Sequence, residues 1–124
     1  MKNVLIVDSD LGFIFWLAEV LVETNYQPWP ASSALEAMSL VSRRRMNSLD
    51  LLIINPSLRG STDLINSLRR TQPDLKVLAV DPLHDRQVRG VNAWRARPNP
   101  ADHSAKQKWA REIDRVLSVH HRAA

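Results

Sequence analysis

Polar side chains stand at the ends of three apolar runs in this chain. Asp8 follows the run at 3–7, Asn55 follows the run at 51–54, and Asp81 follows the run at 75–80. If these runs are neighbouring parallel strands, their polar ends meet at the carboxyl edge of one sheet, where open α/β folds build their sites. Arg97 follows a short run at 93–96 and can reach the same edge. Two carboxylates placed together there repel each other, so the cluster needs a cation to offset their charge.

Apolar patterning predicts the elements that position these side chains. The unbroken runs at 3–7, 51–54 and 75–80 are typical of strands buried on both faces. The run at 26–31 holds Pro28 and Pro30, which cannot donate to a ladder, so this strand is predicted at a sheet edge. Helical patterns cover 11–23, 33–41, 61–68 and 105–117 and alternate with the strands. We therefore expect one domain, residues 1–124, with a parallel sheet covered on both faces.

The second helical pattern also suggests which residues it buries. Ser33 and Glu36 have the spacing of a capping box, which marks the start of a helix. Leu35, Met38 and Val41 follow at helical spacing, and we expect them to form the apolar face of this helix.

Composition restricts the class of protein. The chain has 124 residues, a formal net charge of +4 and no cysteine, so it has no disulfide, thiol nucleophile or zinc-thiolate site. No signal peptide is visible, and the longest apolar stretch, 11–22, contains Glu19 and is too short to cross a bilayer. A basic chain permits acidic partners, but nucleic acid is disfavoured because no helix-turn-helix or RNA-binding strand motif is present. We expect a soluble cytoplasmic protein with no membrane span.

Four stretches in order resemble the receiver domain of bacterial two-component response regulators. They read VLIVDSD, LDLLIINPSLRG, PDLKVLAVD and WRARP, and the resemblance covers nearly the whole chain. It implies a flavodoxin-like, doubly wound α/β fold whose five-stranded parallel sheet has the order 2-1-3-4-5. The segment 82–92 is short for a crossover that contains a helix, so the family's fourth helix is expected to be short or absent.

The resemblance also implies where the family's phosphorylation pocket should lie. Asp8 matches the first acidic residue of the family, whereas Ser9 stands where a second, metal-ligating acid is expected. Asp10, next in sequence, could partly compensate for it. Asn55 stands at the aspartate that accepts the phosphoryl group. Because a neutral carboxamide is not an anionic nucleophile, the match predicts a degenerate pocket.

Two further departures affect the same pocket. Asp81 replaces a hydroxyl residue and Arg97 replaces a lysine. Without the Mg²⁺ that carboxylates would hold, the carboxylate of Asp81 would repel a phosphoryl group. We expect a salt bridge from Arg97 to Asp81 or Asp8, with Asn55 donating its amide hydrogens to one carboxylate. No bound metal and no cofactor are expected.

A second group of residues predicts an interaction surface. Arg86, Arg89 and Arg95 lie around the short segment 82–92. Trp94 stands at the aromatic position whose rotamer accompanies activation in the family. The simpler interpretation, which we favour, is that Trp94 packs against the shortened segment.

These observations predict a pseudo-receiver, a phosphorylation-independent interaction module in bacterial signal transduction rather than an enzyme. Its partner would be a signalling protein, an output domain or a second copy of the chain. The alternatives are a phosphorylatable receiver with unusual site residues, or a nucleotide-binding or enzymatic domain on the same fold. Against the last alternative, the chain has three glycines and no phosphate-cradling loop.

Overall fold

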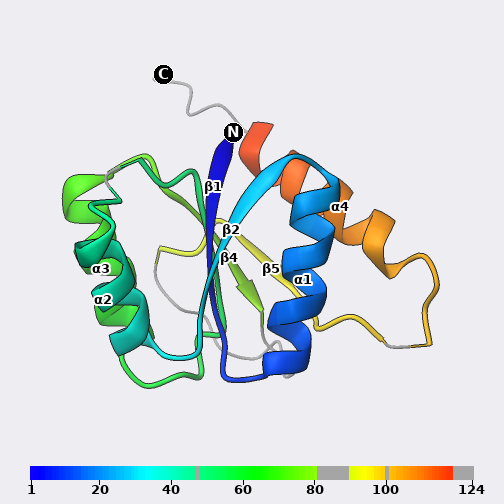
Figure 1. Cartoon of the computed structure of the whole chain (residues 1–124), viewed down its shortest axis with the longest axis horizontal. Coiled ribbons are helices and arrows are strands. Elements are labelled where there is room, and N and C mark those ends of the chain that lie inside the picture. The colour runs from blue at the N-terminus through cyan, green and yellow to red at the C-terminus, as the bar shows by residue number, and fades with distance from the viewer. Residues whose placement is uncertain (47, 81–89, 100, 119–124) are drawn as a thin grey trace.

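The computed structural model describes residues 1–46, 48–80, 90–99 and 101–118, which form an α/β fold (Figure 1). The strands are β1 (Lys2–Val7), β2 (Tyr26–Ala31), β3 (Leu51–Ile54), β4 (Lys76–Val80) and β5 (Ala93–Arg95). The helices are α1 (Leu11–Glu23), α2 (Ala34–Arg43), α3 (Ser61–Thr71) and α4 (Ala105–Ser118). The segment 82–92, where a short or absent helix is predicted, lies mostly outside the described residues.

All four strand pairs are parallel, and the strand order is β2-β1-β3-β4-β5, as predicted. The register places Val7 of β1 beside Ile54 of β3, so the residues that follow these strands emerge at the same carboxyl edge. β2 lies at one edge of the described sheet, beside β1, which confirms the position predicted from its two prolines.

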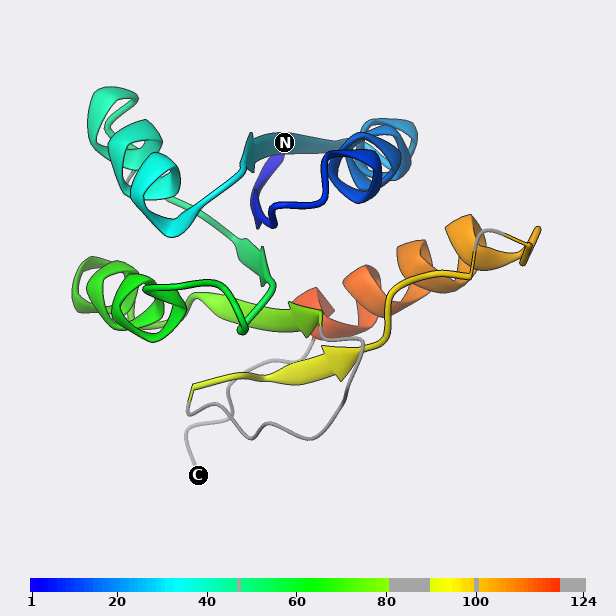
Figure 2. The ribbon, with the colours of Figure 1, turned by 90° about the horizontal axis from the view of Figure 1, so that it is seen from below.

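The sheet is sandwiched between two helical layers. Figure 2 shows α1 and α4 on one side of the sheet and α2 and α3 on the other. Because successive strand residues point to opposite faces, Val4 and Ile6 belong to the core under α1 and α4, and Leu5 and Val7 belong to the core under α2 and α3. The stretches Val4–Val7, Leu51–Ile54 and Val77–Val80 of the central strands are therefore apolar and buried at every position, which is typical of a sheet covered on both faces.

The buried face of α2 differs from the prediction. Ser33 caps this helix through Glu36 N–H, as its spacing predicts, but Leu35 and Met38 are 83% and 37% exposed. Ala34 and Ala37 are buried instead. Small side chains let the start of the helix lie close to the sheet, whereas Leu35 and Met38 are left on the outer side. Val41, the third residue expected on the apolar face, does pack against the core, as does Leu40.

Two helices end in residues with left-handed backbone conformation. Asn25 follows α1 with φ +69°, and Arg45 follows α2 with φ +50°. Arg45 N–H donates to Ser42 O and Met46 N–H donates to Val41 O, the bond pattern of a Schellman motif. Glycine is the usual residue there, and an arginine in this conformation costs roughly 1 kcal/mol.

Within the described residues, no helix combines the length and the apolar character that crossing a membrane requires.

Candidate functional site

Asp8, Asp10 and Arg97 meet at the carboxyl edge of the sheet. The Arg97 guanidinium donates from Nη2 to both carboxylate oxygens of Asp8, at 2.8 and 2.7 Å, and from Nη1 to Asp10 Oδ2 at 2.9 Å. This confirms the predicted ion pair with Asp8, one of the two carboxylates considered. The guanidinium joins the two carboxylates because its planar fork carries several donors in fixed directions.

Local structure holds both carboxylates in place. Asp8, directly after β1, accepts the backbone N–H of Asp10 at 3.0 Å and is only 1% exposed. Asp10 is the N-cap of α1 and accepts Phe13 N–H at 3.2 Å through Oδ1, leaving Oδ2 for Arg97. The guanidinium carbon of Arg97 lies 5.1 Å from the centroid of the Phe13 ring, an additional favourable contact for the cation.

Asn55 has a structural role. Its Oδ1 accepts the backbone N–H of Ser57 at 3.0 Å and the Ser57 hydroxyl at 2.6 Å, which closes the turn after β3. Asn55 is 7% exposed, so the side chain is held inside this turn. Within the described part of the chain, the Asn55 amide makes no hydrogen bond to Asp8, so the predicted donation to a carboxylate is not found there; Asp81, the other carboxylate considered, lies outside the described residues. Asn55 Oδ1 instead accepts hydrogen bonds within the turn after β3, because an asparagine side chain often bonds to the backbone two residues further on. The position of Asn55 at the end of a strand did not predict this local bond.

The structure does not place the other residues of the predicted phosphorylation pocket in the cluster of Asp8, Asp10 and Arg97. Ser9 is exposed in the bend between β1 and α1. Asp81, the alternative partner of Arg97, lies outside the described residues, as do Arg86 and Arg89.

Asp8 and Asp10, the carboxylates described at this edge, do not fit a divalent cation. The receiver resemblance implies Mg²⁺, which takes oxygen ligands in octahedral geometry. Asp8 and Asp10 already share the guanidinium of Arg97, and Ser9 supplies a hydroxyl where the family has a carboxylate. No group of three potential His, Cys, Asp or Glu metal ligands occurs among the described residues. The cation that neutralises Asp8 and Asp10 is thus part of the chain itself.

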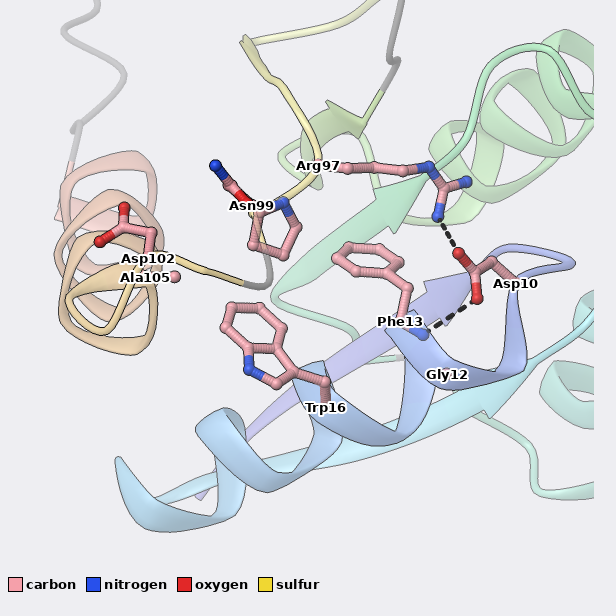
Figure 3. Close-up of a pocket in the computed structure, with 9 residues that line it drawn as sticks. Asp10, Gly12, Phe13, Trp16, Arg97, Asn99, Asp102 and Ala105 are labelled. Atoms are coloured by element: carbon pink, nitrogen blue, oxygen red, sulfur yellow. Dashed lines mark hydrogen bonds and ion pairs between the residues drawn. The ribbon is translucent and has the colours of Figure 1, made fainter.

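A groove of about 350 Å³ opens beside this cluster, between the start of α1 and the segment that leads into α4 (Figure 3). Phe13 and Trp16 from α1 face Asn99 and Asp102 across it, and Arg97 lies at one end. Sequence reasoning missed this groove. The apolar character of α1 on almost every side was the available signal, because a helix of this kind usually has a covered outer face.

The acidic wall of the groove is fixed by hydrogen bonds. Asp102 accepts from Lys108 Nζ at 2.8 Å and from the backbone N–H and hydroxyl of Ser104. The bond from Lys108 is the main reason that the pKa of Asp102 lies well below its usual range. Asp102 therefore remains ionised throughout the physiological range of pH.

The predicted interaction surface is only partly available on the described residues. Trp94 is half-buried on β5. Its predicted packing against the segment 82–92 stays a prediction, because most of that segment lies outside the described residues. Arg95 packs on α4, with its guanidinium 5.7 Å from the Trp109 ring centroid and 3.9 Å from a Glu112 carboxylate oxygen. These contacts hold Arg95 against its own chain.

The fold is closely matched among solved structures. The non-phosphorylated HemR receiver domain from Leptospira biflexa aligns with a TM-score of 0.78 and 22% identity over 100% of both chains. A putative response regulator from Chloroflexus aurantiacus aligns with a TM-score of 0.72 and 24% identity, over 94% of this chain and 97% of that one. A structure of the P1 domain of CheA3 in complex with CheY6 from R. sphaeroides contains a further match, with a TM-score of 0.76 and 13% identity over 94% and 96% of the two chains.

No protein-family model matches the sequence, and no curated protein matches it at a significant level. The architecture is that of a response regulator receiver domain, a CheY-like flavodoxin fold, as the four sequence motifs predict.

Proposed function

We propose that this chain is a pseudo-receiver, an interaction module of bacterial signal transduction that acts without phosphorylation and without enzymatic activity. The observation that carries the proposal is the bridge from Arg97 to Asp8 and Asp10. A receiver-type reaction needs those carboxylates for a metal ion and an anionic acceptor on β3. Here the guanidinium of Arg97 forms ion pairs with both carboxylates. The residue at the acceptor position is Asn55, a neutral amide that is hydrogen-bonded within its own turn.

Exposed apolar side chains support a role in protein contacts. Leu11, Phe15 and Val22 on α1 are 56%, 68% and 62% exposed. Together with Ala18 they follow one another at spacings of three and four residues, so they form one stripe along the helix. Contiguous apolar surface of this kind is typical of interaction sites. The matched complex of CheY6 with the P1 domain of CheA3 shows a receiver-type fold beside a signalling protein, and we propose a cytoplasmic signalling protein or output domain as the partner here.

Phosphorylation can be tested directly. The protein is incubated with acetyl phosphate and Mg²⁺, next to an active receiver domain as positive control, and analysed by intact-mass spectrometry. We expect no phosphoryl adduct on the wild-type chain. Asn55→Asp alone should also remain unlabelled, because Arg97 still occupies the carboxylates that would hold the metal ion.

A stoichiometric adduct on the wild-type chain would contradict the proposal and favour the alternative, a phosphorylatable receiver with unusual residues. An adduct that appears only in Asn55→Asp would show that the bridge of Arg97 does not exclude the metal ion.

A further inference from the structure

A second cavity of about 350 Å³ lies at the opposite, amino end of the sheet. Its lining includes Asn3 at the start of β1, Trp29 of β2, and Arg44 and Arg45 at the end of α2. Asp8 follows the other end of β1, so this cavity lies away from the Arg97 cluster, at the end of the sheet marked N in Figure 1. None of its residues is used by the proposed function.

The aromatic wall of this cavity is held in one orientation. The indole Nε1–H of Trp29 donates to Asn3 Oδ1 at 3.1 Å. The Arg44 guanidinium carbon lies 5.9 Å from the centroid of the indole ring. Met46 and the buried Leu49 add apolar surface. The cavity therefore combines a fixed flat ring with a guanidinium placed over it.

The cations at this cavity have no acidic partner on the described residues. No salt bridge among those residues involves Arg44 or Arg45, a property that they share with Arg43, Arg59, Arg69, Arg70 and Arg111. The helix dipole explains why positive charges lie near the carboxyl end of α2. It does not explain why Arg45 has a left-handed backbone conformation. That residue keeps a long cationic side chain at φ +50°, where glycine would be unstrained. Backbone strain retained at a cavity favours a functional role for the residue.

We propose that this cavity binds a mononucleotide, with its phosphate on Arg45 and its base stacked on the Arg44 guanidinium that lies over the Trp29 ring. A guanidinium matches phosphate oxygens through paired hydrogen bonds, and the flat face of a second guanidinium, held over an indole, can stack on any base. The volume suits a small ligand. The cavity has no glycine-rich loop, so we expect modest affinity, with a Kd on the order of 0.1–1 mM.

Binding is tested on the whole chain by titrating AMP and GMP and following the indole N–H signal of Trp29 by NMR, assigned with Trp29→Phe. Adenosine and inorganic phosphate are titrated separately, to distinguish the two halves of the ligand. The nucleotides should shift the Trp29 signal, and each half alone should bind at least about tenfold more weakly. No shift with millimolar AMP or GMP would overturn the proposal, and so would phosphate binding as tightly as AMP.

The variant Arg45→Gly tests whether the Arg45 side chain contacts the ligand or only supports the structure. Because glycine adopts the left-handed conformation without strain, this variant should melt at or above the wild-type temperature and yet bind AMP about tenfold more weakly. Arg44→Ala should weaken binding to a similar extent. Arg70→Ala, an exposed arginine at the end of α3, should bind as the wild type does. Wild-type affinity in both Arg44→Ala and Arg45→Gly would overturn the assignment.

Discussion

Arg97 links two segments that are far apart in the sequence. Its partner Asp8 is 89 residues away and almost fully buried, while the arginine side chain is 23% exposed. A buried carboxylate with no cation would be costly, because burial disfavours its charged form. Nη2 of Arg97 meets both oxygens of Asp8, and Nη1 reaches Asp10, the cap of α1. One side chain therefore joins the start of α1 to the segment after β5, without a metal ion.

The strength of this bridge can be measured by comparing Arg97→Ala, Asp8→Asn and the double variant in denaturant unfolding. Removing the arginine should cost about 3 kcal/mol, because it leaves a buried charge uncompensated. We expect the double variant to lose less free energy of unfolding than the two single variants lose in sum, and the difference should be about 1 kcal/mol or more.

Arg95→Ala is the control, since Arg95 meets Glu112 only at 3.9 Å and should lose about 1 kcal/mol or less. Additive losses for Arg97 and Asp8 would show that the bridge contributes nothing to stability.

At the scale of elements, polar contacts hold α4 against its neighbours. Lys106 at the start of α4 lies 3.2 Å from a Glu19 oxygen and 3.5 Å from a Glu23 oxygen, both on α1. Near the other end of α4, the hydroxyl of Tyr26 on β2 donates to Asp114. Between these contacts, Phe13, Trp16 and Trp109 pack together, with Phe13 and Trp109 in an edge-to-face arrangement at 5.5 Å between centroids. α1 and α4 are therefore joined to each other and to the edge strand.

The Tyr26 contact predicts a specific response to alkaline pH. Burial, and next the hydrogen bond to Asp114, raise the pKa of Tyr26 from 10.0 to about 12. Because the folded-state pKa is the higher one, this contribution to stability is complete below pH 10 and is lost as the pH rises from 10 to about 12.

Tyr26 is the single tyrosine of the chain, so ultraviolet absorbance reports its ionisation directly. The folded protein should ionise close to pH 12, and the urea-unfolded chain close to pH 10. In Asp114→Asn the folded-state midpoint should move toward 10. A folded midpoint of 10 in the wild type would show that the hydroxyl is free in solution.

At the scale of the whole molecule, the outer edge of β2 limits how copies can associate. Ala31 O accepts Asp8 N–H, so Ala31 directs its backbone groups toward β1. Backbone direction alternates along a strand, and Pro28 and Pro30 therefore face outward. Their rings remove the N–H groups that another strand would need. This edge is protected against strand addition, a common route to aggregation.

Replacing both prolines with valine should open this edge. We expect Pro28→Val/Pro30→Val to associate with increasing concentration in sedimentation experiments, because two outward N–H groups become available for pairing. The wild type should form no assembly through a ladder across β2. Pro73→Val, a proline outside the sheet, serves as the control. If the double variant sediments as the wild type does, the prolines are not what protects the edge.

The sequence by itself determined the strand and helix alternation, the edge position of β2 and the polar ends of the central strands. These features depend on local properties: apolar runs of strand length, proline without an N–H, and side-chain period. They were sufficient to predict the strand order through the receiver resemblance. They also placed Asp8 and Arg97 at one edge, because parallel strands share their carboxyl ends.

Tertiary structure decided which groups actually meet. From sequence alone, Arg97 could pair with Asp8 or Asp81. Only the fold shows that its two terminal nitrogens are divided between Asp8 and Asp10, and that Asp10 is at the same time the helix cap. The buried face of α2 and the cavity beside Trp29 were likewise invisible, because each depends on how closely elements distant in sequence approach. Local patterning fixes the direction of a side chain within its own element, whereas its partner is chosen by packing between elements.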